Sequence, residues 1–133
     1  MIIDAQDHIL GRLASHLVSE LKDGEEVHVI NAEKAIVKGN PQSINKKYQD
    51  KFEAGSRDFG PYFPRNPQNL LKRTVEGMLP DTQDGEDMRS RLKVYSGTPD
   101  DLDDAEVIED AHESGLPASQ YQTLQAIADH LGA

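Results

Sequence analysis

The chain has 133 residues, a length that fits one domain or one domain with a tail. Ile, Leu, Val and Phe make up 30 of these residues, which is enough for a thin hydrophobic core. Cysteine is absent, which excludes disulfides and thiolate metal sites. The longest apolar run is three residues, so we expect no transmembrane helix, no secretory signal and no membrane partner. The composition therefore predicts a soluble, cytoplasmic protein.

The net charge of −10 is unevenly distributed along the chain. Residues 94–133 contain nine acidic residues and no Lys or Arg, whereas residues 34–73 contain nine basic and three acidic residues. A uniformly acidic surface would repel nucleic acid, but a basic middle can still bind a polyanion. The surplus of Asp over Glu, 14 to 10, and the low count of 8 Lys are typical of halophilic proteins, although an ordinary acidic cytosolic protein has a similar composition.

The first half of the chain alternates strand and helix patterns. A short apolar strand at residues 1–5 precedes a helix whose apolar residues recur every three or four positions between Ile9 and Leu21. We expect Asp7 to cap the start of this helix and Gly24 to follow its end. Apolar, β-branched runs predict strands at 27–30 and 35–37. Asn40-Pro41 then predicts the start of a second helix.

The second half contains two further helices, one strand and an acidic segment. Residues 55–67 form a loop rich in Gly, Pro and aromatic residues, and Asn66-Pro67 again predicts a helix start. That helix runs to Leu79 and stops at Pro80. A short helix near 86–92, a strand at 93–95, a polar acidic stretch at 96–118 and a last helix at 121–131 follow. This alternation predicts an α/β fold with a small, mostly parallel sheet.

No motif predicts an enzyme. The phosphate-binding loop, the dinucleotide fingerprint and the nucleophile elbow are absent, and the five His residues have no metal-ligand spacing. The run Asp100–Asp104 could supply carboxylates to Mg²⁺ or Ca²⁺, but it lacks the Gly and the distal Glu of a calcium-binding EF-hand loop. A solvated acidic loop is the simpler interpretation. A small metal-dependent α/β enzyme or acidic regulatory domain remains the alternative function.

The basic middle is more informative about function. Five of the seven Phe and Tyr residues lie between Tyr48 and Phe63, among the basic residues, and such mixtures bind phosphates and stack on unpaired bases. Tyr48 and Phe52 also fit core positions of a helix. Gly77 lies in the last turn of its helix, where it costs about 1 kcal/mol relative to Ala, so we expect an RNA backbone or a neighbouring helix to approach it closely. The candidate RNA-binding residues are Arg12, Lys34, Lys38, Lys47, Lys51, Arg57, Arg65, Lys72, Arg73 and Gly77.

Four motifs occur together in a familiar order: LGRLAS at 10–15, INAEK at 30–34 with VKG at 37–39, KRTVEGMLP at 72–80, and LKVY at 92–95 with Gly97. With them the chain resembles the L-thirteen family of large-subunit ribosomal proteins over about residues 1–99. Gly97-Thr98-Pro99 and the C-terminal segment from Tyr121 are similar to the archaeal branch, and the acidic composition then indicates a halophilic archaeon.

The resemblance implies a structural protein that binds large-subunit ribosomal RNA, touches neighbouring ribosomal proteins and supports subunit assembly. It implies a three-layer α/β/α fold with a mostly parallel four-stranded sheet, with no catalytic role, cofactor or small-molecule substrate. We expect residues 1–133 to form one domain with an acidic C-terminal extension from about residue 97. Glu76 and residues 81–87 replace residues that are usually basic in the family, so the resemblance carries no RNA contact over to them.

The acidic C-terminal end is expected to point away from RNA because it offers no Lys or Arg for phosphate. The predicted last helix nevertheless has an apolar stripe. This stripe consists of Leu124, Ile127, Ala128 and Leu131. It must be buried, either on this protein's own sheet layer or against another ribosomal protein.

Overall fold

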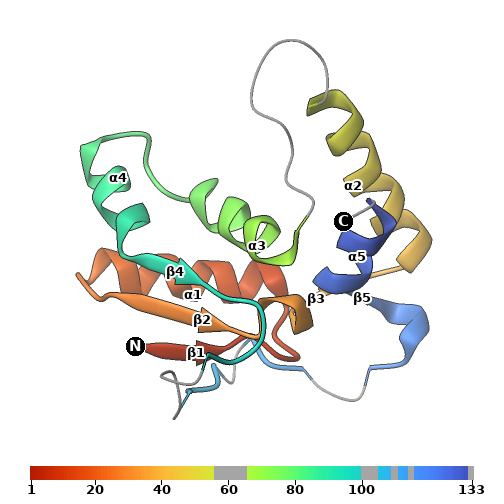
Figure 1. The fold of residues 1–133 in the computed structure, drawn as a ribbon, viewed down its shortest axis with the longest axis horizontal. Coiled ribbons are helices and arrows are strands. Elements are labelled where there is room, and N and C mark those ends of the chain that lie inside the picture. Colours follow the sequence, from red (N-terminus) through yellow and green to blue (C-terminus); the bar gives the residue numbers. More distant parts are fainter. Residues whose placement is uncertain (56–65, 100–104, 109–110, 114–115, 132–133) are drawn as a thin grey trace.

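The fold is a mixed α/β arrangement, as the alternating sequence pattern predicts (Figure 1). The computed structural model describes residues 1–55, 66–99, 105–108, 111–113 and 116–131, without the side chains of residues 51–55 and 118. In chain order the elements are β1 (Ile2–Asp4), α1 (Leu10–Lys22), β2 (Val27–Ile30), the 3₁₀ turn η1 (Ala32–Lys34), β3 (Ile36–Lys38), α2 (Pro41–Gly55), α3 (Pro67–Glu76), α4 (Gln83–Ser90), β4 (Leu92–Val94), the 3₁₀ turn η2 (Ala118–Gln120), β5 (Tyr121–Thr123) and α5 (Leu124–His130).

The strands form two small sheets. β1, β2 and β4 are parallel in the order β1-β2-β4, while β3 pairs with β5 in an antiparallel ribbon. All four predicted strands are present, but the third joins β5 instead of the parallel sheet. We expected residues 121–123 to be helical. They are extended because Thr123 caps α5, its side chain accepting a hydrogen bond from the N–H of Ala126, so the helix begins only at Leu124.

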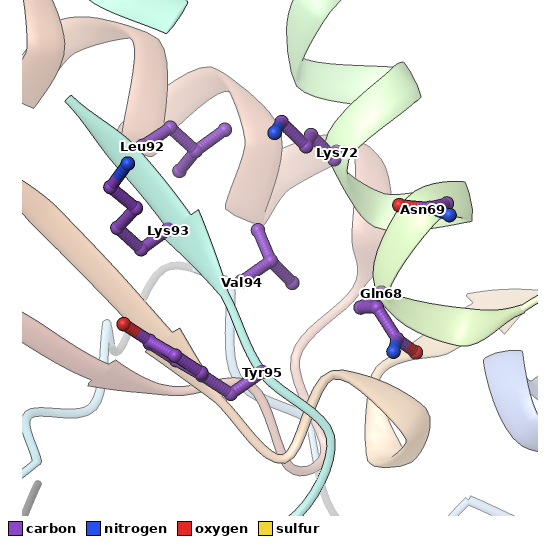
Figure 2. Close-up of a pocket in the computed structure, with 7 residues that line it drawn as sticks. All are labelled: Gln68, Asn69, Lys72, Leu92, Lys93, Val94 and Tyr95. Atoms are coloured by element: carbon purple, nitrogen blue, oxygen red, sulfur yellow. The ribbon is translucent and has the colours of Figure 1, made fainter. Parts of the chain in front are cut away.

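Both helices that cover the parallel sheet lie on the same face. α1 and α3 pack against each other, and α1 also contacts β2 while α3 contacts β4. In Figure 2, Leu92 and Val94 point from β4 toward α3, while Lys93 and Tyr95 lie on the other side of the strand. Lys93 is exposed and the His28 side chain is partly exposed on that second face. α1 and α3 thus form the helical layer that packs on the described parallel sheet, in keeping with the predicted α/β fold.

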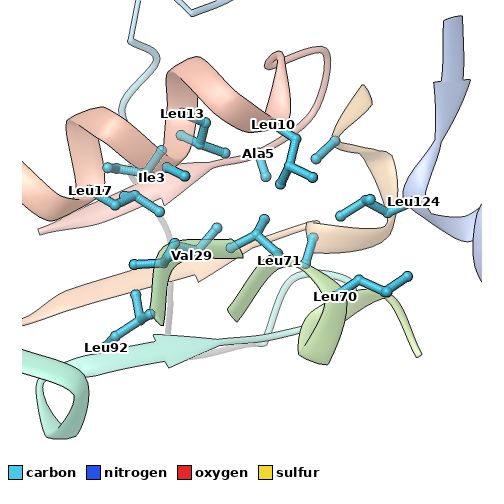
Figure 3. Packing of buried hydrophobic residues seen from close by; sticks show 14 of the residues in the cluster. Ile3, Ala5, Leu10, Leu13, Leu17, Val29, Leu70, Leu71, Leu92 and Leu124 are labelled. Carbon is cyan, nitrogen blue, oxygen red and sulfur yellow. The ribbon is translucent and has the colours of Figure 1, made fainter. Parts of the chain in front are cut away.

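One cluster of buried residues joins both ends of the chain (Figure 3). Its members include Leu13 and Leu17 of α1, Val29 of β2, Leu71 of α3 and Leu124 of α5, all fully buried. α5 contacts α2, α3 and η1. The apolar stripe of the last helix is thus buried in this protein's own core, which is the first of the two alternatives that the sequence left open.

The helix caps are partly as predicted. Asn40 Oδ1 accepts a hydrogen bond from Gln42 N at 2.9 Å, and Asn66 Oδ1 accepts one from Asn69 N at 3.0 Å, so both predicted caps are confirmed. The prediction for Asp7 is wrong, because α1 begins three residues later, at Leu10. The backbone at Asp7 has a positive φ of 61°, and the Ile9–Ile36 bridge keeps the chain extended up to the helix.

Residues 105–108 and 111–113, together called segment 105–113, are attached to the N-terminal part of the chain through backbone hydrogen bonds and one buried imidazole. Glu106 pairs with β1, its N–H donating to Ile2 O at 2.8 Å. His8 is fully buried, and its Nε2 accepts the N–H of Ile108 at 3.0 Å. The other nitrogen, Nδ1, therefore carries the proton and donates to Gln6 O at 3.0 Å. Desolvation by burial lowers the pKa of His8 below its ordinary value of 6.5.

Candidate nucleic-acid interface

The basic candidates are distributed over several elements instead of lining one cleft. Arg12 on α1, Lys34 on η1, Lys38 on β3, Lys47 on α2 and Arg73 on α3 have exposed side chains. Lys72, also on α3, is half-buried. The side chain of Lys51 and the whole of Arg57 and Arg65 lie outside the described residues. The structure therefore indicates a broad binding surface for RNA instead of a single pocket.

The start of α1 and the end of α3 meet at a surface of small residues. The Ser15 hydroxyl donates to Gly11 O at 3.2 Å and lies 4.0 Å from Met78 Sδ. Gly11 and Gly77 are both exposed next to this contact. Arg12 directly follows Gly11, and Arg73 lies one helical turn before Gly77. We call these residues, Gly11, Arg12, Ser15, Arg73 and Gly77, the α1–α3 surface.

A side chain would fit at both glycines of the α1–α3 surface, so packing among the described residues does not require glycine there. A Cβ added to Gly11 would meet no atom within 4 Å, and one added to Gly77 would meet only carbonyl oxygens of its own helix, at 3.5 and 3.6 Å. Gly77 has a φ of −65°, which any residue adopts. Of the two alternatives for Gly77, no described helix of this chain occupies the space, so the space is open to a backbone from outside. Gly77 follows the last residue of α3 and does not lie within it as predicted, because the helix ends at Glu76.

A groove between α3 and β4 has a volume of about 170 Å³. Its lining includes the predicted Lys72 and also Lys93, which the motif-based selection missed (Figure 2). The alternation of Leu92, Lys93 and Val94 was the available signal, because a strand with two buried apolar neighbours exposes the residue between them.

Lys38 is engaged within the chain. Its Nζ lies 3.2 Å from both carboxylate oxygens of Glu113, with about half of the Lys38 side chain exposed. An RNA phosphate would have to compete with this carboxylate.

The INAEK motif is largely structural. Asn31 is buried with a φ of 55°, and its Nδ2 donates to Asp4 Oδ1 at 3.0 Å. Its Oδ1 accepts the Thr98 hydroxyl at 3.3 Å. The Glu33 carboxylate accepts the N–H of Gly97 at 2.8 Å. Asn31 and Glu33 thus hold the segment after β4 in place. Of Asn31, Glu33 and Lys34, only Lys34 has an exposed side chain that is available to a partner.

Metal chemistry finds no support among the described residues, where no group of three or more His, Asp or Glu side chains could hold an ion. The Asp100–Asp104 run, which carried the enzymatic alternative, lies outside those residues. Both ring nitrogens of His8 are occupied by backbone partners. Within the same ranges, every helix is too short or too polar to cross a membrane.

Known proteins are similar to this chain over most of its length. The sequence profile of the family described as ribosomal protein L13 matches residues 1–101. The large ribosomal subunit protein uL13 of Methanosarcina barkeri is 45% identical over 99% of this chain and 97% of its own length. The protein of the same name from Archaeoglobus fulgidus is 43% identical over 98% of this chain and 86% of its own. The one from Haloarcula marismortui is 38% identical over all of this chain and 91% of its own.

Proposed function

Since this chain belongs to the ribosomal protein L13 family, we propose that its exposed basic residues bind the phosphates of large-subunit ribosomal RNA, with the α1–α3 surface at the centre of the contact. The chain is a structural constituent of the large ribosomal subunit and acts in the cytoplasm as part of the ribosome. Neighbouring ribosomal proteins are its other partners. The archaeal relatives include halophiles, and the acid-rich, Lys-poor composition supports a halophilic source.

The observation that carries the proposal is a pair of exposed glycines, each near an exposed arginine of the same helix or helix end. Within a helix such as α1, Gly is less stable than Ala by about 1 kcal/mol, and neither Gly11 in α1 nor Gly77 at the end of α3 is required by a contact among the described residues. A side chain at either position would hold an approaching backbone away from the helix surface. Arg12 and Arg73 stand beside this open surface and can donate to phosphate oxygens.

The remaining candidates would extend the contact on both sides. Lys34, Lys38 and Lys47 are exposed on other elements, and Lys72 is half-buried on α3. Lys51, Arg57 and Arg65 stay in the proposal on their sequence pattern alone. Contacts of this kind position a protein on RNA but do not read its sequence, so the affinity should depend strongly on salt.

A glycine substitution tests the proposal most sharply. Gly77→Ala has room for its methyl group and an ordinary φ, so the unfolding free energy should stay equal or rise. Its affinity for large-subunit ribosomal RNA, transcribed from the organism that encodes the chain, should nevertheless fall. Arg12→Ala and Arg73→Ala should each flatten the slope of log affinity against log salt by up to about one unit.

The matched control is Lys22→Ala, which removes an exposed cation from the far end of α1. It should leave both the affinity and the salt slope close to those of the unmodified protein. If Gly77→Ala and the Arg12→Ala/Arg73→Ala double variant fold and bind this RNA as tightly as the unmodified protein, the α1–α3 surface is not an RNA contact.

A further inference from the structure

We propose that the groove between α3 and β4 binds one phosphate of the RNA backbone between Lys72 and Lys93. This inference rests on the proposed function, gives Lys72 a specific place in the contact and adds Lys93, which the RNA-binding candidates did not include. The groove, called here the α3–β4 groove, is lined by Gln68, Asn69, Lys72, Leu92, Lys93, Val94 and Tyr95.

The α3–β4 groove lies at the free edge of the parallel sheet. β4 is an outer strand, and its bonds to β2 run through alternate residues, since Arg91 O accepts from Val27 N at 2.9 Å and Tyr95 N donates to Val29 O at 2.8 Å. The peptide groups of Leu92 and Val94 therefore point to the open side. The groove thus offers backbone N–H donors next to the side chains of α3.

The charge of the groove is unusual for this chain. The protein has 24 acidic residues and only 8 Lys, yet two Lys line the groove and no acidic residue does. In the described ranges neither Lys72 nor Lys93 forms an ion pair, whereas Lys38 does. Figure 2 shows Lys72 reaching from α3 toward β4, and Lys93 rising from the other side of the strand. Two unpaired ammonium groups at one edge favour an anion.

The size of the groove indicates one phosphate group. A volume of about 170 Å³ lies below the roughly 300–1,000 Å³ typical of sites for cofactors and small molecules. A phosphate with part of its ribose fits this space, and the lysine ammonium groups and the amides of Gln68 and Asn69 supply donors for its oxygens.

An extended peptide added to β4 is the competing occupant, and the structure disfavours it. β4 has only three residues, and the Ser96 hydroxyl donates to Gln68 Oε1 at 2.8 Å beyond the end of the strand. This bond joins the segment after β4 to the first turn of α3, so it closes the path along which a paired peptide would continue. A phosphate needs only the open edge.

Lysine footprinting on the full chain tests the groove. The protein is acetylated in high salt, alone, with large-subunit ribosomal RNA and within the assembled large subunit, and each lysine is quantified by mass spectrometry. We expect RNA alone to protect Lys72 and Lys93 several-fold while Lys22 keeps its reactivity. Protection of the two groove lysines only in the assembled subunit would assign the groove to a protein neighbour and overturn the inference.

Substitutions give a second measurement. Lys93→Gln and Lys72→Gln should each lower RNA affinity in moderate salt and flatten its salt slope by up to about one unit, whereas Lys22→Gln should not. Unchanged affinity and slope in both variants would overturn the inference even if RNA binding itself is intact. A chain that binds no large-subunit ribosomal RNA at all would instead overturn the proposed function together with this site.

Discussion

The basic middle and the acidic C-terminal end have opposite surfaces but share one core. Residues 34–73 carry a net charge of +6, and residues 94–133 carry −9. Leu70 and Leu71 from the first region are nevertheless buried in the same cluster as Leu124 and Ile127 from the second. Charge along the chain therefore describes which partners a surface can meet, while the apolar pattern describes which segments fold together.

The acidic region adds polar attachments to this shared apolar packing. The helices of the basic region, α2 and α3, begin at capped positions and pack through apolar side chains. Residues 105–108 and 111–113 are attached by polar contacts, from Glu106 to β1, from Ile108 to His8 and from Lys38 to Glu113, and the buried Ala111 packs in the core. Stability should thus depend on both regions, whereas we expect no direct RNA contact from residues 94–133.

Leu124→Ala should have the largest effect on stability. Leu124 is fully buried where α5 packs on the core, so truncation leaves a cavity and costs about 2–5 kcal/mol of unfolding free energy. Denaturant titration in high salt measures this loss, and Gln125→Ala, on the exposed side of the same helix, is the matched control. RNA affinity per folded molecule should stay unchanged. A large loss of affinity in the folded fraction would break the separation between the two regions.

Asn31→Ala should have the next largest effect on stability. The substitution removes the bonds to Asp4 and Thr98 and places Ala at a φ of 55°, so we expect a loss of about 1–3 kcal/mol. Asn31→Gly separates the lost hydrogen bonds from the backbone strain. It also loses the bonds to Asp4 and Thr98, but glycine adopts a positive φ without strain. In thermal melts, Asn31→Gly should have a higher melting temperature than Asn31→Ala. Equal melting temperatures would show that the positive φ contributes nothing.

Much of this fold could be predicted from local patterns. The 3.6-residue spacing of α1 and the Asn-Pro starts of α2 and α3 determine helices through short-range physics, and the four strands follow from β-branched runs. The pairing of β3 with β5 could not be predicted, because the partners are 83 or more residues apart and Tyr121–Thr123 is too short to show a period. The hydrogen bond from Ile108 N to the buried His8 could not be predicted either, because the two residues are far apart in the sequence.

The candidate site was predictable to a smaller extent. Exposure of Arg12, Lys34 and Arg73 follows from their places beside apolar residues in helices or turns. The role of Asn31 as an anchor could not be seen, because its partners Asp4 and Thr98 lie in two distant segments. Lys93 was overlooked although its alternation with Leu92 was visible, since the groove it lines exists only once α3 packs beside β4.

Salt should stabilise the acidic region selectively. At 0.1 M salt the Debye length is about 10 Å, and above 1 M it falls to about 3 Å or less, so the acidic side chains of residues 94–133 repel each other only in dilute salt. We expect a melting temperature at least about 4 °C higher in 3 M than in 0.1 M KCl. Neutralising Glu106 and Asp129, both exposed, should reduce this difference more than neutralising Asp23 and Glu25. Equal melting temperatures in both salts would count against a halophilic source.

Acid should weaken the attachment of segment 105–113. Because burial lowers the pKa of His8 below 6.5, the unfolded chain binds a proton there at a higher pH than the folded chain does. The stability from neutral His8 is complete above pH 6.5 and is lost as the pH falls toward the folded-state pKa. Asp4 and His112 also act on His8, in opposite directions. His8→Gln should flatten the profile of unfolding free energy against pH between pH 7.5 and 5.5 relative to the unmodified protein.

Glu113→Gln should have the smallest effect on stability and a distinct one on RNA binding. The Lys38–Glu113 pair is largely solvated, so its loss should change the unfolding free energy by less than about 1 kcal/mol. The variant frees the Lys38 ammonium from a carboxylate 3.2 Å away, and if that ammonium contacts a phosphate, the salt slope of RNA binding should steepen by up to about one unit. The Lys38→Gln/Glu113→Gln double variant should return the slope to that of the unmodified protein or below it. Identical slopes in all three proteins would remove Lys38 from the RNA interface and leave its pair with Glu113 as a purely internal link between the basic and acidic regions.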